Sequence, residues 1–107
     1  MTTTYVTDAY ALAAQEDRCA PRIKIDLPAM LRPSGSNAFA TTIVDLSLGG
    51  FAANAVTGMR AGARCWLSVG PCKGLEAEVV WNDGTAIGCA FVTLLNQAVL
   101  EAIIAGR

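Results

Sequence analysis

The sequence contains no histidine, and this absence removes a whole set of reaction mechanisms. Without histidine there is no Ser-His-Asp or Cys-His pair, and no imidazole that acts as a general base near neutral pH. The four cysteines show no Cys-x-x-Cys spacing, so zinc would require all four to converge without any local motif. We therefore expect no metal and no cofactor, and we interpret the cysteines as small apolar fillers or surface thiols.

Long apolar runs and an excess of positive charge are missing too. No run approaches the roughly 18 apolar residues that cross a bilayer. The first 17 residues contain no Lys or Arg, which a secretory signal would need. The net charge of −1 gives no general attraction to DNA, RNA or anionic membranes. We expect a cytoplasmic protein that neither inserts into a membrane nor binds DNA or RNA.

What the chain does contain is enough apolar material for one folded domain. It has 107 residues, of which 53% are hydrophobic, so it is long enough for a single modest core and too apolar for disorder. Charge is unevenly distributed, because residues 18–32 form the most basic segment. This segment contains Arg18, Arg22, Lys24 and Arg32.

From residue 22 onward, apolar and polar residues alternate with a period of two, which is typical of strands with one buried face. The alternation predicts strands over residues 22–32, 39–44, 51–55, 64–69, 73–81 and 85–92. Pro28 cannot donate to a ladder, so we expect it at an edge or a bulge. The same alternation predicts that Val79 and Trp81 point inward, and Asp83-Gly84 predicts a tight hairpin turn.

The period changes to that of a helix over residues 95–105, where Leu95, Val99 and Ile103 share one face. Six short strands and a helix predict a mainly β fold, namely a six-stranded antiparallel β-barrel with a C-terminal α-helix. Closure removes exposed strand edges, and the helix can cover an open end. We assign residues 18–107 to this domain. Residues 1–17 are expected to be a mobile N-terminal segment with a short helix over residues 8–15.

Residues 45–50, Asp-Leu-Ser-Leu-Gly-Gly, form the predicted corner between the second and third strands. Asp45 can accept hydrogen bonds from N–H groups, and Ser47 can donate one to an anionic oxygen. Gly49 and Gly50 would let the chain turn through positive φ and let a ligand approach the backbone. The alternative is a plain hairpin turn, where Asp, Ser and Gly are favoured for backbone reasons alone.

Arg18 and Arg22 lie just before the first predicted strand. A guanidinium group offers a planar fork of donors that matches phosphate oxygens or the O6/N7 edge of guanine. The alternative is a pair of solvated arginines. Asp45 and Ser47 do not suggest an enzyme, because no third group is present to orient them as base and nucleophile. We therefore expect a binding protein that is not an enzyme.

Taken together, the two motifs resemble those of the PilZ domain family, bacterial receptors for cyclic di-GMP. The motifs are Arg-x-x-x-Arg at residues 18–22 and Asp-x-Ser-x-x-Gly at residues 45–50. Residues 75–81 followed by the Gly-Cys-Ala-Phe of residues 88–91 resemble the family's last hairpin, and the terminal helix has its usual place. The resemblance covers roughly residues 16–105, nearly the whole chain.

The resemblance implies a role for each motif residue. Arg18 and Arg22 would hold guanine edges and phosphates of cyclic di-GMP, and Asp45 would accept from guanine N–H groups. Ser47 would bond a phosphate or nearby ligand oxygen, and Gly50 would leave room at the corner.

Our leading hypothesis is a stand-alone second-messenger receptor that signals to an unidentified protein partner through ligand-induced ordering of the segment from Arg18 to Arg22. The alternative is a PilZ-like adaptor that binds no nucleotide and acts only by protein–protein interaction. Asp17 favours this alternative, because its carboxylate would repel a phosphate or compete for Arg22.

Overall fold

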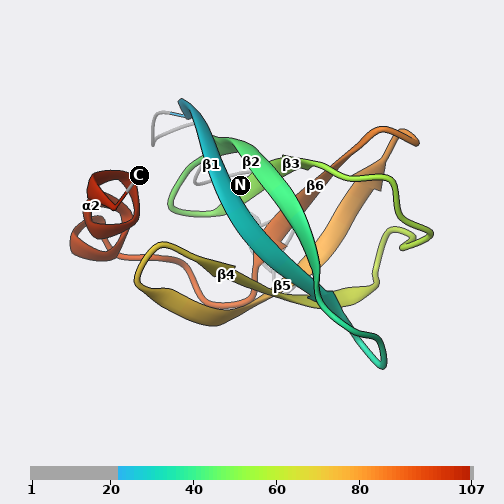
Figure 1. Cartoon of the computed structure of the whole chain (residues 1–107). Helices are drawn as coiled ribbons and strands as arrows, with labels where there is room; N and C mark the ends of the chain where they lie inside the picture. The colour runs from blue at the N-terminus through green and yellow to red at the C-terminus, as the bar shows by residue number, and fades with distance from the viewer. Residues whose placement is uncertain (1–21, 107) are drawn as a thin grey trace, which may run out of the picture.

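Residues 22–106, the part of the chain that the structure describes, form six strands and one helix in this computed structural model (Figure 1). In chain order they are β1 (Ile23–Pro33), β2 (Phe39–Leu46), β3 (Gly50–Asn54), β4 (Arg64–Val69), β5 (Cys72–Asn82), β6 (Ala86–Phe91) and α2 (Gln97–Ala105). The strands pair antiparallel in the order β1-β2-β3-β6-β5-β4, and β4 returns to β1. The predicted six-stranded antiparallel barrel with a C-terminal helix is confirmed. The expected segment 1–17, its helix and Arg18 lie outside the described residues.

The core fills the barrel with side chains from the inward-facing positions of each strand. In β1 the alternation is complete, because every second residue from Ile25 to Leu31 is buried while those between are exposed. Full burial of one such side chain contributes about 1.5–3 kcal/mol. The largest fully buried side chains include Phe91, Leu31, Ile43, Leu46, Leu67, Ile87 and Ile103.

Pro28 lies at a place where β1 has a neighbour on one side only. It pairs with Thr42 of β2, whereas the ladder between β1 and β4 begins one residue later, at Ala29. The register between β1 and β2 also shifts between Lys24 and Leu27. The missing N–H of proline therefore breaks no ladder to β4, as the sequence predicts.

Helix α2 covers one end of the barrel, beside the turn between β4 and β5 (Figure 1). Asn96 caps it, because its side chain accepts the N–H of Val99 at 2.8 Å. Leu100 and Ile103 are its buried residues. Contact with the turn is close, since a Cβ added to Gly70 would lie 3.5 Å from Ile103 Cα. The described part of the chain contains no helix with both the length and the apolar character of a membrane span.

Trp81 does not point inward, so that prediction is wrong. Val79 pairs with Cys89 and Trp81 pairs with Gly88, which leaves Val80 as an extra residue of β5 opposite a single step of β6. Such a bulge reverses the faces of the residues that follow it. Val79 is accordingly buried, whereas Trp81 is 44% exposed on the outside of the barrel.

The hairpin between β5 and β6 turns at Asp83-Gly84, as the sequence predicts, with Gly84 at φ 98°. The Asp83 carboxylate accepts the backbone N–H groups of Thr85 at 2.9 Å and Ala86 at 2.8 Å, and the Thr85 hydroxyl at 3.1 Å. These hydrogen bonds lower the pKa of Asp83 because they favour its ionised form. The bond from the Thr85 N–H has the largest effect, and the bond from the Ala86 N–H has the next largest.

We expect Asp83→Ala to lower the melting temperature at pH 7 and to have a smaller effect in acid. A carboxyl group whose pKa is lower in the folded state stabilises that state above its unfolded pKa of about 4. This contribution is lost as the pH falls through the folded-state pKa. Thermal unfolding of both proteins, from pH 7 downward, measures the difference. A difference that stays constant into strong acid would contradict the role of this carboxylate.

Candidate functional site

The predicted corner at residues 45–50 is shorter in the structure than in the sequence prediction. Strand β2 runs on through Leu46 and β3 begins at Gly50, so only residues 47–49 form the turn. The Ser47 N–H donates to the Gly50 carbonyl at 2.9 Å, and Ser47 Oγ accepts the Gly49 N–H at 3.2 Å. Ser47 is only 2% exposed. In this state its hydroxyl helps to hold the turn.

The prediction that Gly49 and Gly50 adopt positive φ is wrong, because the positive-φ glycines in the described part of the chain lie elsewhere. Gly50 is required for space. A Cβ at this position would lie 2.2 Å from the Cys89 carbonyl oxygen of the paired strand β6. The room that this glycine leaves is therefore used by the β6 backbone.

Asp45 faces the outside of the barrel because of a bulge in β2. Ile43 pairs with Ala53 and Asp45 pairs with Ala52, so that Val44 is an extra residue opposite a single step of β3. Without it, Asp45 would continue the inward series of Thr41 and Ile43, both of which are buried. The residue remains largely covered, with 10% of its side chain exposed.

The structure brings Arg22 and Asp45 together, although 23 positions separate them in the sequence. Arg22 Nη1 lies 3.1 Å from Asp45 Oδ2, and the arginine side chain is 53% exposed. The resemblance assigns both residues to one ligand, which requires them to lie close together, and their observed contact agrees with that requirement. The position of Arg18 relative to them lies outside the described residues.

Lys24 is a third charged residue beside Arg22 and Asp45, and neither sequence motif includes it. Its Nζ lies 3.5 Å from the same Asp45 Oδ2, and its side chain is 86% exposed. In the ladder between β1 and β2, Lys24 is the residue directly opposite Asp45. The available signal was its spacing, because two positions after Arg22 in an alternating strand lead back to the same face.

These charged groups belong to a line of paired residues that crosses five strands of the barrel. Lys24 pairs with Asp45, Asp45 with Ala52, Ala52 with Gly88, and Gly88 with Trp81. We call these five residues the outer row. Adjacent strands lie about 4.8 Å apart, so the backbone of Asp45 is about 10 Å from that of Gly88. The outer row thus joins a charged end to an aromatic end across two small residues.

Trp81 lies flat against the backbone at the aromatic end of the outer row. A Cβ added to Gly88 would lie 2.1 Å from the indole Nε1 and 2.4 Å from Cε2, so only glycine leaves room for the ring. The sequence contained one signal for this arrangement. Counting back from the turn at Asp83-Gly84 sets Gly88 near Trp81 in the hairpin, although the bulge at Val80 is not visible in the pattern.

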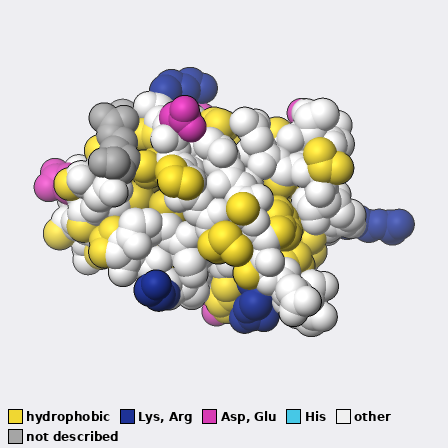
Figure 2. Space-filling view, viewed as in Figure 1, with side chains coloured by type: hydrophobic (Ala, Val, Ile, Leu, Met, Phe, Trp, Pro, Cys, Tyr) yellow, Lys and Arg dark blue, Asp and Glu magenta, His cyan; other side chains and the backbone are white. Residues whose placement is uncertain are grey.

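Chemically, the outer row suits a flat ligand that carries both negative charge and N–H donors. Arg22, which lies beside the outer row at Asp45, supplies a cation for a ligand oxygen, and Asp45 supplies acceptor oxygens. Trp81 supplies an exposed aromatic surface on which a base can stack, as bases do on aromatic side chains of many nucleic-acid-binding proteins. Figure 2 shows Lys and Arg atoms in separate places on the face that it draws, and they do not form a continuous basic surface.

The cysteines do not form a metal centre in the described part of the chain. Residues 22–106 contain no group of three or more side chains placed to hold a metal ion. Cys65 and Cys89 are buried in the barrel, as the sequence predicts for apolar fillers. The Cys89 thiol donates a hydrogen bond to Cys65, which lowers the pKa of Cys65 and, together with burial, raises the pKa of Cys89. Cys72 is half-buried, and all three thiols are free.

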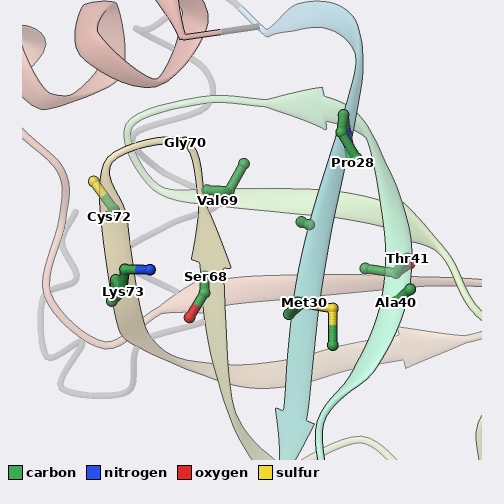
Figure 3. Close-up of a pocket in the computed structure, with 10 residues that line it drawn as sticks. Pro28, Met30, Ala40, Thr41, Ser68, Val69, Gly70, Cys72 and Lys73 are labelled. Atoms are coloured by element: carbon green, nitrogen blue, oxygen red, sulfur yellow. The ribbon is translucent and has the colours of Figure 1, made fainter.

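A depression of about 340 Å³ lies outside the outer row, on β1, β2 and the β4–β5 hairpin (Figure 3). Its lining is mostly apolar and includes Met30, Ala40 and Val69, with Lys73 beside them. None of the charged residues around Asp45 lines it, and neither does Trp81. The depression is therefore separate from the candidate site.

We expect Gly50→Ala to destabilise the fold by about 1–3 kcal/mol, because the added methyl group would meet a backbone carbonyl that cannot rotate away. Gly58→Ala is the matched control, since a Cβ there meets nothing within 4 Å. Urea unfolding of the three proteins gives the comparison. Equal stabilities of the parent and Gly50→Ala would show that the approach of β6 does not explain this glycine.

The comparison with protein families agrees with this geometry. The family model described as the PilZ domain matches residues 16–106, which is most of the chain. No curated protein is similar enough to the sequence to count as a relative. The matched range includes both motifs, all six strands and the terminal helix. Members of this family are ligand-binding receptor domains for cyclic di-GMP rather than enzymes. The chain therefore belongs to the PilZ domain family.

Proposed function

We propose that this protein binds cyclic di-GMP at the outer row and signals to a protein partner. The observation that carries the proposal is the 3.1 Å contact between Arg22 and Asp45. One residue comes from each of the two family motifs, and the fold holds them on one face. Arg18, Ser47 and Gly50 complete the proposed binding set.

Each proposed contact follows from the chemistry of the ligand. Cyclic di-GMP carries two phosphate charges, and the planar guanidinium groups of Arg18 and Arg22 match phosphate oxygens or a guanine edge. The N–H groups of guanine need an acceptor, which Asp45 provides. Ser47 would turn its hydroxyl from the corner toward a ligand oxygen, and Gly50 supports the corner by letting β6 pack closely against it.

The existing ion pair between Arg22 and Asp45 is compatible with binding. Arg22 is its exposed member, with 53% of its side chain exposed, so its guanidinium group can turn to a ligand at little cost. Asp45 is largely covered, but Lys24 contacts the same carboxylate oxygen and can stay with it. A micromolar affinity corresponds to about 8 kcal/mol, so the exchange of one exposed cation is a small part of the total.

Trp81 extends the proposed site beyond the family motifs. Stacking of a base on an aromatic side chain contributes about 1–3 kcal/mol. The indole already lies against Gly88, and 44% of the residue is exposed.

Signalling in this proposal uses the segment that contains the arginines. Arg22 already lies beside Asp45 without a ligand. Binding would order the whole of residues 18–22 around the ligand, and a partner would recognise the changed surface through its different affinity for the two states.

Calorimetric titration with cyclic di-GMP tests the binding proposal. We expect the parent to bind and Arg22→Ala to lose affinity by about tenfold or more, since a bidentate contact contributes about 1–3 kcal/mol. Arg60→Ala, an exposed arginine of the loop between β3 and β4, is the control and should bind like the parent. Absence of heat with the parent, or equal affinity of the parent and Arg22→Ala, would reject the proposal.

Tryptophan fluorescence tests the stacking contact separately. Cyclic di-GMP should quench the emission of the parent and of Trp66→Phe, but have little effect on Trp81→Phe. Trp66 is the matched control because its ring is already covered by Arg32, whose Cζ lies 4.4 Å from the ring centroid. A ligand response that persists in Trp81→Phe and disappears in Trp66→Phe would place the ligand elsewhere.

A nucleotide-independent adaptor remains the second candidate, and one observation favours it. Asp45 already has two cationic partners and is largely covered, which is what a purely structural carboxylate would need. The two candidates differ in affinity capture. Protein partners that are recovered equally with and without cyclic di-GMP, from a parent that gives no binding heat, would support the adaptor.

A further inference from the structure

Two cations share a single oxygen atom at the candidate site. Arg22 Nη1 and Lys24 Nζ both contact Asp45 Oδ2, at 3.1 and 3.5 Å. The carboxylate is the covered member, with 10% of its side chain exposed, whereas the lysine side chain is 86% exposed. The charge that most needs a partner is therefore that of Asp45.

Recruitment of Arg22 by a ligand phosphate would leave that carboxylate short of one cation. A covered charge without a partner is costly, because it has lost its water and gained nothing in return. The ligand can supply guanine N–H donors to Asp45, but these are neutral and do not replace the positive charge. Release of Arg22 is thus favourable only if another cation stays with Asp45.

Lys24 meets the geometric requirements for this task. It lies directly opposite Asp45 in the ladder of β1 and β2, so its backbone is fixed by the barrel. Its present contact of 3.5 Å is longer than the 2.7–2.9 Å of a strong charge-assisted hydrogen bond, so it has room to close in. A flexible stem and three rotatable N–H donors suit such an adjustment, whereas the planar fork of arginine suits phosphate.

We propose that Lys24 is an affinity-setting positioning residue, which holds Asp45 when Arg22 turns to the ligand. This inference rests on the proposed function for the ligand step. Lys24 acts through Asp45 and makes no contact with the ligand itself. The two cations therefore have separate tasks: Arg22 exchanges partners, and Lys24 remains with the carboxylate.

The first test needs no ligand and is an unfolding cycle with Arg22→Ala, Lys24→Ala and the double variant. Once Arg22 is absent, Lys24 is the remaining cation of the pair, so its removal should lower the melting temperature more in the Arg22→Ala protein than in the parent. Lys73→Ala, the other lysine of the chain, should have the same small effect in both backgrounds. An equal drop for Lys24→Ala in both backgrounds would overturn the proposal.

The second test is calorimetric titration with cyclic di-GMP. Lys24→Ala should weaken binding about twofold to fivefold, which is the scale of one ion pair, while Lys24→Arg should restore it and Lys73→Ala should leave it unchanged. In an Asp45→Asn background, removal of Lys24 should have no further effect. A further loss there would mean that Lys24 contacts the ligand directly, and the positioning role would be wrong.

The outcomes separate the two levels of the argument. A parent that does not bind cyclic di-GMP rejects the proposed function, whereas a parent that binds with the same affinity as Lys24→Ala rejects only the role of Lys24. If Asp45→Asn binds cyclic di-GMP too weakly to measure, the unfolding cycle alone decides whether Lys24 stabilises the Asp45 carboxylate.

Discussion

Side chains of a strand alternate strictly between two faces, and the candidate site exists because this alternation is interrupted twice. Val44 in β2 and Val80 in β5 are each one residue more than the partner strand provides. An uninterrupted β2 would direct the Asp45 carboxylate into an apolar core, at a cost of several kcal/mol. The two bulges turn a carboxylate of β2 and an indole of β5 to the outside of the barrel, on one line of paired residues.

Small residues in β3 and β6 are the second condition for this surface. Gly50 lets β6 come close, and Gly88 lets the indole of Trp81 lie against the strand. Between the charged end and the aromatic end, the outer row has only Ala52 and Gly88. The small residues that permit close packing therefore leave no large side chain in the middle of the candidate site. Close strand packing and access to the surface both depend on this absence of large side chains.

The sequence predicted the fold well, because period-two alternation, turn residues and a helical period each report on local structure. The resemblance carried by the two motifs together assigned Arg22 and Asp45 to one ligand, and the structure brings these two residues together. Trp81 and Lys24 were missed for physical reasons. A bulge leaves no mark in the pattern, so Trp81 looked like the next inward residue after Val79. The pairing of Lys24 with Asp45 depends on the register between two strands, which no single strand specifies.

Closure of the sheet also restricts how another protein can recognise this one. A receptor with an open sheet can exchange backbone hydrogen bonds with an incoming peptide, which then joins the sheet as one more strand. In a barrel whose strands follow one another from β1 to β4 and back, most backbone groups already have partners. Recognition by another protein would then depend on exposed side chains, so a change of a few of these residues would alter which protein can bind while the barrel stays the same.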